Sequence, residues 1–375
     1  MLTDLDEILM DESVVEKKQE EEIITPVTPS GKIEPDDEAI KLAGRLEGWN
    51  KSCRDLFLDL RAITFEATDE DMKLEFKDKS FYDKSIYFKM DPDDNKSDKI
   101  TLARKQLCKL IGIPYNFFMN NRPSMKMDIF KTWQASLNAE DSKGKCLARI
   151  RESQDCCIIR AMVSDTYSPI QNHEIIKLVN ETITVPYKLE MVSGDERDDL
   201  IMHARFIFGD TFEVLGQKVC LGFSITASEF GESPLIVDSF LYHMESKTAY
   251  LATYGKEPYF KSKYEGIQPK TFKELLPTMI TRMQEEAGEY KKRIESISGK
   301  VTPLDECVKL KTWKGLPTKF KMGIFQEAYK NEEDMGNTFG FARHMSLMAK
   351  DYDIHKRVEI ERTTGRYLNL VFSKQ

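Results

Sequence analysis

Residues 200–243 read LIMHARFIFGDTFEVLGQKVCLGFSITASEFGESPLIVDSFLYH, and this stretch decides the fold class. Apolar and polar residues nearly alternate over Leu200–Phe208, Lys218–Ala227 and Pro234–His243, which is the pattern of half-buried strands. No helical segment of ~10–15 residues separates these strands, so a doubly wound parallel sheet is disfavoured. We therefore expect a central, mainly antiparallel sheet.

The flanking segments add helices and shorter strands. The sequence predicts strands at 63–67, 72–76, 85–90, 145–151 and 156–164, the last two forming a hairpin around the turn ESQD. It predicts helices at 38–61, 101–112, 125–137 and 172–184, then helices alone at 269–297, 303–313, 317–330, 338–350 and 354–370. The expected class is α+β, with flanking helices and a helical C-terminal region. We divide the chain into an acidic tail (1–37), an α+β core domain (38–268) and a helical region (269–375).

Charge is distributed unevenly along the chain. The formal net charge of the 375 residues is -8, but residues 1–40 hold thirteen Asp and Glu against three Lys, a net of -10. The remaining residues therefore carry +2, a balance that permits a nucleic-acid partner without demanding one. The charge run, the prolines and the lack of aromatic residues predict that 11–37 are disordered. Helical spacing of Leu2, Leu5, Ile8 and Leu9 leaves open a short helix in residues 1–10 that binds a protein partner.

Cysteine usage and hydropathy bear on the compartment. Seven cysteines form an odd set with no repeated close spacing, which favours reduced thiols in a cytoplasm over a disulfide framework. No stretch approaches the ~20 apolar residues of a membrane helix, and the acidic N-terminus is unlike a signal peptide. We expect a cytoplasmic protein that does not enter a membrane.

Few catalytic patterns are present. The chain has no GxxxxGK[ST], no GxGxxG after a strand, no GxSxG and no HExxH, so we expect no cofactor and favour a non-enzymatic role. The acidic loop 91–98 lacks the Gly and Glu of a calcium-binding EF-hand. Asp165, Glu229, Glu232 and Asp238 lie near strand ends, and a metal-dependent nuclease built on such acids is the alternative function.

Basic residues interleaved with aromatic ones give the strongest functional signal. Arg149 and Arg151 lie two apart on one predicted strand, so they share a face, and Arg160 lies on the next strand. Such arginines can contact phosphates, whereas aromatic rings stack on unpaired bases. The candidate nucleic-acid-binding residues are Arg149, Arg151, Arg160, Tyr167, Tyr254, Lys256, Tyr259, Lys261 and Lys263.

Two lysine-rich stretches also combine basic with aromatic residues. YLATYGKEPYFKSKY at 250–264 has the composition of a single-strand groove, but its aromatics could equally pack inward while its lysines merely face water. KLKTWKGLPTKFKMG at 309–323 combines five Lys with Trp313 and Phe320. Both stretches are candidates for strand binding.

Three separated segments also resemble a known family. They are IRAMVSDTYSPI at 159–170, FSITASEFGES at 223–233 and GNTFGFARHMSLMA at 336–349. Their order is similar to that of the phage/plasmid-like protein family, a domain of unknown function found in prophages and mobile elements. The chain departs from the family where LATYGKEPYF replaces a C-x-N-G stretch, and Ala227 replaces the usual Asn. The matching residues are Arg160, Ser164, Asp165 and Tyr167, then Ser228, Glu229 and Gly231, then Asn337, Thr338 and Gly340.

The resemblance covers about residues 100–370 and implies a mobile element and a bacterial cytoplasm, but no reaction. Together with the basic and aromatic residues it predicts a phage or mobile-element protein that binds single-stranded nucleic acid, in recombination or replication, as a homo-oligomer. A metal-dependent nuclease, and a host-interaction protein that acts through its acidic tail, remain the alternatives.

Overall fold

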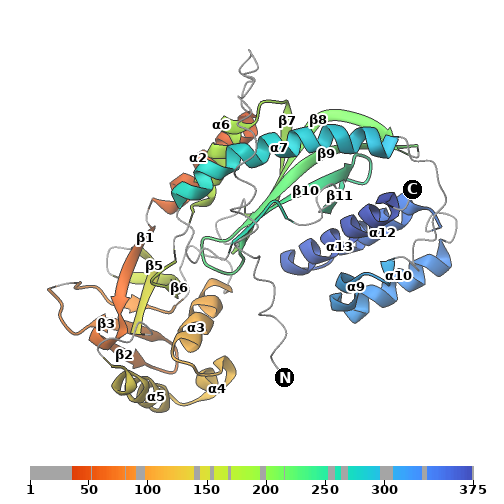
Figure 1. The fold of residues 1–375 in the computed structure, drawn as a ribbon. Helices are drawn as coiled ribbons and strands as arrows, with labels where there is room; N and C mark the ends of the chain where they lie inside the picture. The colour runs from red at the N-terminus through yellow and green to blue at the C-terminus, as the bar shows by residue number, and fades with distance from the viewer. Residues whose placement is uncertain are drawn as a thin grey trace. The chain divides into compact units, whose positions relative to one another are not determined.

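The computed structural model describes residues 36–51, 53–80, 82–89, 98–138, 144–152, 156–167, 170–194, 200–214, 216–251, 258–262, 269–295, 307–331 and 336–373. The predictions for the acidic tail, for residues 1–10 and for the loop 91–98 therefore concern residues outside or almost outside this set. Within it, the fold is α+β with two mainly antiparallel sheets and flanking helices, as predicted (Figure 1).

The first sheet has six strands in the order β1-β5-β6-β4-β3-β2. All neighbours pair antiparallel except β4 and β6, which are parallel. One face is covered by α3, α4 and α5, whose apolar side chains share a core with it (Figure 1). The bounds are β1 Cys53–Asp59, β2 Ile63–Ala67, β3 Met72–Phe76, β4 Ile86–Tyr87, β5 Lys145–Glu152, β6 Cys157–Ser164, α3 Asp98–Leu110, α4 Tyr115–Asn120 and α5 Pro123–Ser136.

The second sheet contains the strands of residues 200–243. Its order is β11-β10-β9-β8-β7, with β12 pairing beside β11 on β10. Because the chain turns back directly between β8, β9 and β10, these long strands pair antiparallel along most of their length. The bounds are β7 Tyr187–Ser193, β8 Met202–Val214, β9 Gln217–Ala227, β10 Leu235–His243, β11 Thr248–Leu251 and β12 Phe260–Ser262.

Helices cover both faces of the second sheet (Figure 1). On β8, Met202, Ala204, Phe206 and Phe208 point toward the core shared with α2, α6 and α7, and the intervening residues point toward α13. Both faces are buried, which explains why β9 from Val219 onward and all of β10 have so little exposed surface. The bounds are α2 Asp37–Asn50, α6 Asn172–Thr182, α7 Pro269–Glu295, α9 Lys311–Gly315, α10 Thr318–Lys330, α12 Thr338–Ala349 and α13 Ile354–Ser373.

The predicted helix at 38–61 is wrong in its second half. The helix ends at Asn50, and Cys53–Asp59 forms β1, paired with β5 over its whole length. Leu56 is half-buried and Leu58 is buried while Phe57 between them is exposed, which is the period of a strand. The apolar residues of this segment satisfy both the helical and the strand period, so periodicity alone could not separate the two.

A glycine allows α13 to approach the sheet closely. At Gly365 an added Cβ would overlap the carbonyl oxygen of Leu251 on β11. Only a residue without a side chain lets the helix backbone pack directly on the strand backbone at this point. The C-terminal helix is therefore fixed against β11, and its polar residues are held over the sheet.

Candidate nucleic-acid interface

The predicted hairpin of β5 and β6 forms, with a bulge at Arg160. Arg149 pairs with Ala161 and Ile150 with Ile159, so Arg160 has no partner in the ladder. Its guanidinium points away from the ladder, donating to Cys53 Sγ at 2.7 Å and lying 4.7 Å from the centroid of the Phe230 ring. Arg160 is half-buried by these contacts.

Arg149 is 5% exposed and holds the two sheets together. Its Nε donates to Asp55 Oδ1 at 2.9 Å, and its Nη1 donates to the Glu229 carbonyl at 2.6 Å. The Glu229 carboxylate in turn accepts hydrogen bonds from the Asn172 amide and from Asn50. A guanidinium with these partners is not presented to a phosphate in this structure, because burial and pairing occupy its donors. Arg151, its neighbour on the strand, is half-buried.

Tyr167 also serves this junction. Its hydroxyl donates to the Ser228 carbonyl at 2.8 Å, and burial raises the pKa of its phenol. The Ser228 hydroxyl accepts from the amides of Phe230 and Glu232, so residues 228–232 form a compact turn against the first sheet. The segments 159–170 and 223–233, which resemble the phage/plasmid-like family, are thus in contact here, and the contacts support the fold. Asn337, in the third segment, caps the N-terminus of α12 by accepting from the Gly340 amide.

The 250–264 stretch is described only in part. Tyr254, Lys256 and Lys263 lie outside the described residues. Tyr259 is half-buried and donates its hydroxyl to Glu286 on α7, and burial raises its pKa. Lys261, on β12, is exposed. Of Tyr259 and Lys261, only Lys261 has an exposed side chain that a partner could contact.

Three of the four acids considered for a nuclease have charged partners in the fold. Glu229 is paired as above, Asp238 pairs with Arg362, and Glu232 lies 3.6 Å from His355 Nε2. In the described part of the chain, no group of three His, Cys, Asp or Glu could hold a metal ion. Nothing in these residues favours the nuclease alternative.

A row of polar residues, buried except for the half-buried Glu190, lies beneath α13. The register aligns Glu190, Arg205, Ser224 and Asp238 across β7, β8, β9 and β10 on one face of the second sheet. From α13, Glu361 accepts from Arg205 with both oxygens 2.6 Å from Nη2, and Arg357 donates to the same carboxylate at 3.0 Å. The charges of the polar row and those of α13 offset each other, and these contacts fix the position of α13 on the sheet.

His203 shares that face with Ser224 and Asp238, the residue types of a hydrolase triad. Its Nδ1 bonds the Thr226 hydroxyl at 2.8 Å instead, and the Ser224 hydroxyl has no hydrogen-bond partner among the described atoms. A nucleophile needs a base within hydrogen-bonding reach, and Asp238 is committed to Arg362. The arrangement therefore lacks the relay of a triad.

Lysines are concentrated in and next to α9 and α10. Residues 307–331 contain six Lys and one acid, Glu327. Lys311, Lys314, Lys319 and Lys330 are exposed, and none makes an ion pair with any residue that the structure describes. Lysines without counter-ions on two consecutive helices are the charge pattern expected of a surface that binds an anionic partner.

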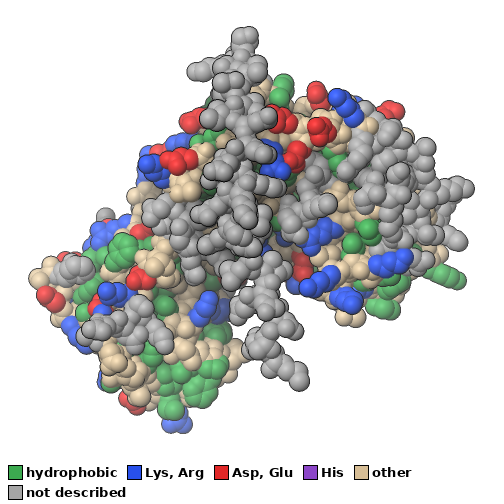
Figure 2. Space-filling model, viewed as in Figure 1, with side chains coloured by type: hydrophobic (Ala, Val, Ile, Leu, Met, Phe, Trp, Pro, Cys, Tyr) green, Lys and Arg blue, Asp and Glu red, His purple; other side chains and the backbone are tan. Residues whose placement is uncertain are grey.

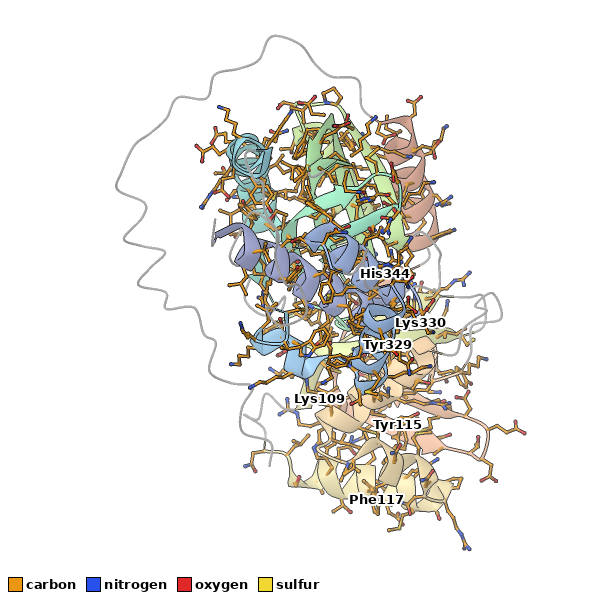
Figure 3. All side chains as sticks on the ribbon, turned by 90° about the vertical axis from the view of Figure 1, so that its right-hand side faces the viewer. Lys109, Tyr115, Phe117, Tyr329, Lys330 and His344 are labelled. Carbon is orange, nitrogen blue, oxygen red and sulfur yellow. The ribbon has the colours of Figure 1, made fainter. Side chains whose placement is uncertain are left out.

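Exposed hydrophobic side chains, two of them aromatic, lie on α10. Met322, Phe325 and Tyr329 follow each other at helical spacing along α10, and Tyr329 is 91% exposed. Figure 3 shows Tyr329 and Lys330 together at the end of α10, near His344 of α12. We call Lys311, Lys314, Lys319, Lys330, Phe325 and Tyr329 the α9–α10 surface.

The lysine-rich stretch 309–323 is apparent from the sequence, but both of its aromatic rings are buried. Trp313 and Phe320 are buried and pack beneath the helices, whereas Phe325 and Tyr329 lie beyond that stretch. Ring position on the helix decides exposure: Phe320 and Ile324 form the inner face, and the residues at 322, 325 and 329 form the outer one. A smaller group, Lys109 with Tyr115 and Phe117, occurs on α3 and α4 (Figure 3).

Comparison with protein-family models, with curated proteins and with solved structures found no match. The family resemblance therefore stays a prediction. None of the helices in the described ranges is long and apolar enough to cross a membrane.

Proposed function

We propose that the protein binds single-stranded nucleic acid through the α9–α10 surface. The observation that carries the proposal is the run of four exposed, unpaired lysines beside an almost fully exposed tyrosine. Lysines neutralise successive phosphates and release their counter-ions, while a free ring offers a platform on which any base can stack. Lys261 on β12 is a further exposed cation from the predicted set.

The biological setting belongs to the same proposal. The three family-like segments support a phage or related mobile element, with a role in recombination or replication. All seven cysteines are free thiols, which is compatible with a reducing cytoplasm. A homo-oligomer that lines up copies along one strand would suit this function.

A salt series tests the binding mode. Full-length protein is titrated with a fluorescent single strand, and the logarithm of the binding constant is plotted against that of the salt concentration. Replacing Lys311, Lys314 and Lys319 with alanine should reduce the slope by about 2, because each phosphate contact on a single strand contributes ~0.7. Tyr329→Ala should weaken binding by about 1–3 kcal/mol with little change of slope, and Tyr329→Phe should retain the affinity.

The control replaces three exposed lysines elsewhere, Lys131, Lys188 and Lys218, with alanine. This variant removes the same charge and should keep most of the slope. Equal losses in the two triple variants would show that only overall charge matters. No binding even at low salt would rule out the proposed function.

A further inference from the structure

β1 is the outer strand of the first sheet and has a neighbour on one side only. It pairs with β5 from Cys53 to Asp59, and among the described residues no other main-chain hydrogen bond reaches Arg54–Leu58. The outer N–H and C=O groups of such a strand can pair with another strand. Figure 1 shows β1 at the border of its sheet.

Every charged residue on β1 is already matched within the fold. Arg54 lies 3.1 Å from Glu152, Asp55 lies 2.9 Å from Arg149, and Asp59 lies 2.7 Å from Arg61. Phe57, by contrast, is an apolar residue of this strand whose ring is 65% exposed to solvent. Edge strands that avoid pairing usually place charge at such a position, whereas an exposed ring favours pairing. Hydrophobic side chains reach the surface over this region in Figure 2.

A cavity of about 550 Å³ lies at the end of the same strand. Its apolar wall is formed by Phe57, Leu58, Ala62, Phe76 and Cys146. Leu58 and Cys146 are buried at its base, and burial raises the pKa of the Cys146 thiol to about 12, so the thiol stays neutral. A cavity of this size and lining accepts an apolar side chain.

The rim of the cavity is negatively charged. Asp78 and Asp165 have no cation within 4.0 Å among the described residues, and Lys145 has no carboxylate within that distance. Asp59 is neutralised by Arg61. The two unpaired carboxylates therefore outnumber the single ammonium, which favours a basic group beside the apolar one.

We propose that the β1 edge and this cavity bind an extended segment of a partner protein, which adds to the sheet as a seventh strand. Its main chain pairs with β1, and one aliphatic or aromatic side chain fills the cavity. An Arg or Lys two positions away, on the same face of the added strand, lies against Asp78 and Asp165. This site uses no residue of the α9–α10 surface, so it does not depend on the proposed nucleic-acid binding.

A peptide selection on the full-length protein tests this site. The probes are capped heptapeptides of Thr and Val whose third and fifth positions are varied through all residue types. We expect enrichment of an apolar residue at one position and Arg or Lys at the other. Phe57→Ala should weaken the selected peptides about tenfold or more, as for a central interface ring. Phe117→Ala, which removes an exposed ring on α4, should not.

Two further variants separate the parts of the proposal. Asp165→Asn combined with Asp78→Asn should abolish the preference for Arg and Lys while leaving the apolar preference. N-methylation of alternate peptide amides should abolish binding, because it removes the donors of the added strand. Selection of no common pattern, or equal affinity for Phe57→Ala and wild type, would overturn the proposal. Single-strand binding by the Phe57→Ala protein should equal wild type, which distinguishes the two proposals.

Discussion

Arg205 on β8 and Glu361 on α13 form an ion pair from which water is excluded on both sides. Arg205 is fully buried, Glu361 is buried, and Arg205 Nη2 lies 2.6 Å from both carboxylate oxygens across a sequence separation of 156 residues. Such a pair contributes little net stability, because desolvation offsets its attraction, but losing one partner leaves a buried charge. The pair thus specifies where α13 lies.

Glu361→Ala should lower the free energy of unfolding by about 3–5 kcal/mol, because the buried Arg205 keeps only the more distant carboxylate of Glu190, 3.7 Å from its Nη1. The double replacement Arg205→Met with Glu361→Leu should recover most of that loss. Urea denaturation of Arg205→Met, of Glu361→Leu and of the double variant measures the coupling. If the double variant is as unstable as the sum of the single ones, the two residues act independently and this account of α13 is wrong.

Gly365 gives a second test of how α13 is held. Gly365→Ala places a methyl group against the Leu251 carbonyl, so the helix must move away from β11 and the melting temperature should fall. Gly288, in α7, is the matched control because an added Cβ there meets nothing within 4 Å. Gly288→Ala should stabilise by about 0.5–1 kcal/mol, the difference in helix propensity. The two melting curves should therefore shift in opposite directions, and equal shifts would contradict the close approach.

His203 predicts how stability depends on pH. Burial, and then the charge of Arg205 with those of Arg357 and Arg362, lowers its pKa well below 6.5. In the unfolded chain His203 therefore takes up a proton near pH 6.5, whereas in the folded chain it stays neutral at that pH. Stability from this group is complete above pH 6.5 and is lost as the pH falls from there toward the lower folded-state pKa.

His203→Asn removes the titration and keeps a polar group next to Thr226. Unfolding free energies measured between pH 5 and 8 should fall more steeply toward acid for wild type than for this variant. His243 also has a lowered pKa and remains in both proteins, so a residual slope is expected. Parallel curves for the two proteins would exclude His203 as a source of acid sensitivity.

The sequence predicted most elements of the fold because period and spacing are local properties. The three long strands follow from near-alternation, and the β5–β6 hairpin follows from two strand-like runs on either side of the turn ESQD. The segment 51–61 failed because its leucines fit two periods. Which faces become covered is a tertiary property: alternation places Arg149 and Arg151 on one face, but it could not show that residues 228–232 bury the first of them.

The same limit applies to the candidate interface. Lysine density at 309–330 was visible in the sequence, but the choice between Trp313 and Tyr329 as the exposed ring depends on how α10 packs against α12. The free edge of β1 was not predicted, since β1 itself was assigned to a helix. Edge position and cavities arise only from the order of strands in the sheet, which no single segment encodes.

The acidic N-terminal residues should weaken nucleic-acid binding by their charge. Residues 1–35 hold ten acids and three lysines, so removing them changes the formal net charge from -8 to -1. Less repulsion of phosphate should tighten binding several-fold at low salt, and the effect should vanish as salt shortens the Debye length to ~8 Å and below. The melting temperature should change little, because Glu34–Gln375 forms a compact unit by itself.

Two full-length variants separate charge from sequence. Replacing the acids of residues 1–35 with Asn and Gln should reproduce the effect of truncation, whereas shuffling those residues at constant composition should leave wild-type affinity. Binding constants measured over a salt series decide between them. If the shuffled protein binds as tightly as the truncated one, the order of residues matters more than their charge, and a specific docking segment replaces simple repulsion as the cause. Equal affinities for all four proteins would show that the acidic residues do not influence nucleic-acid binding at all.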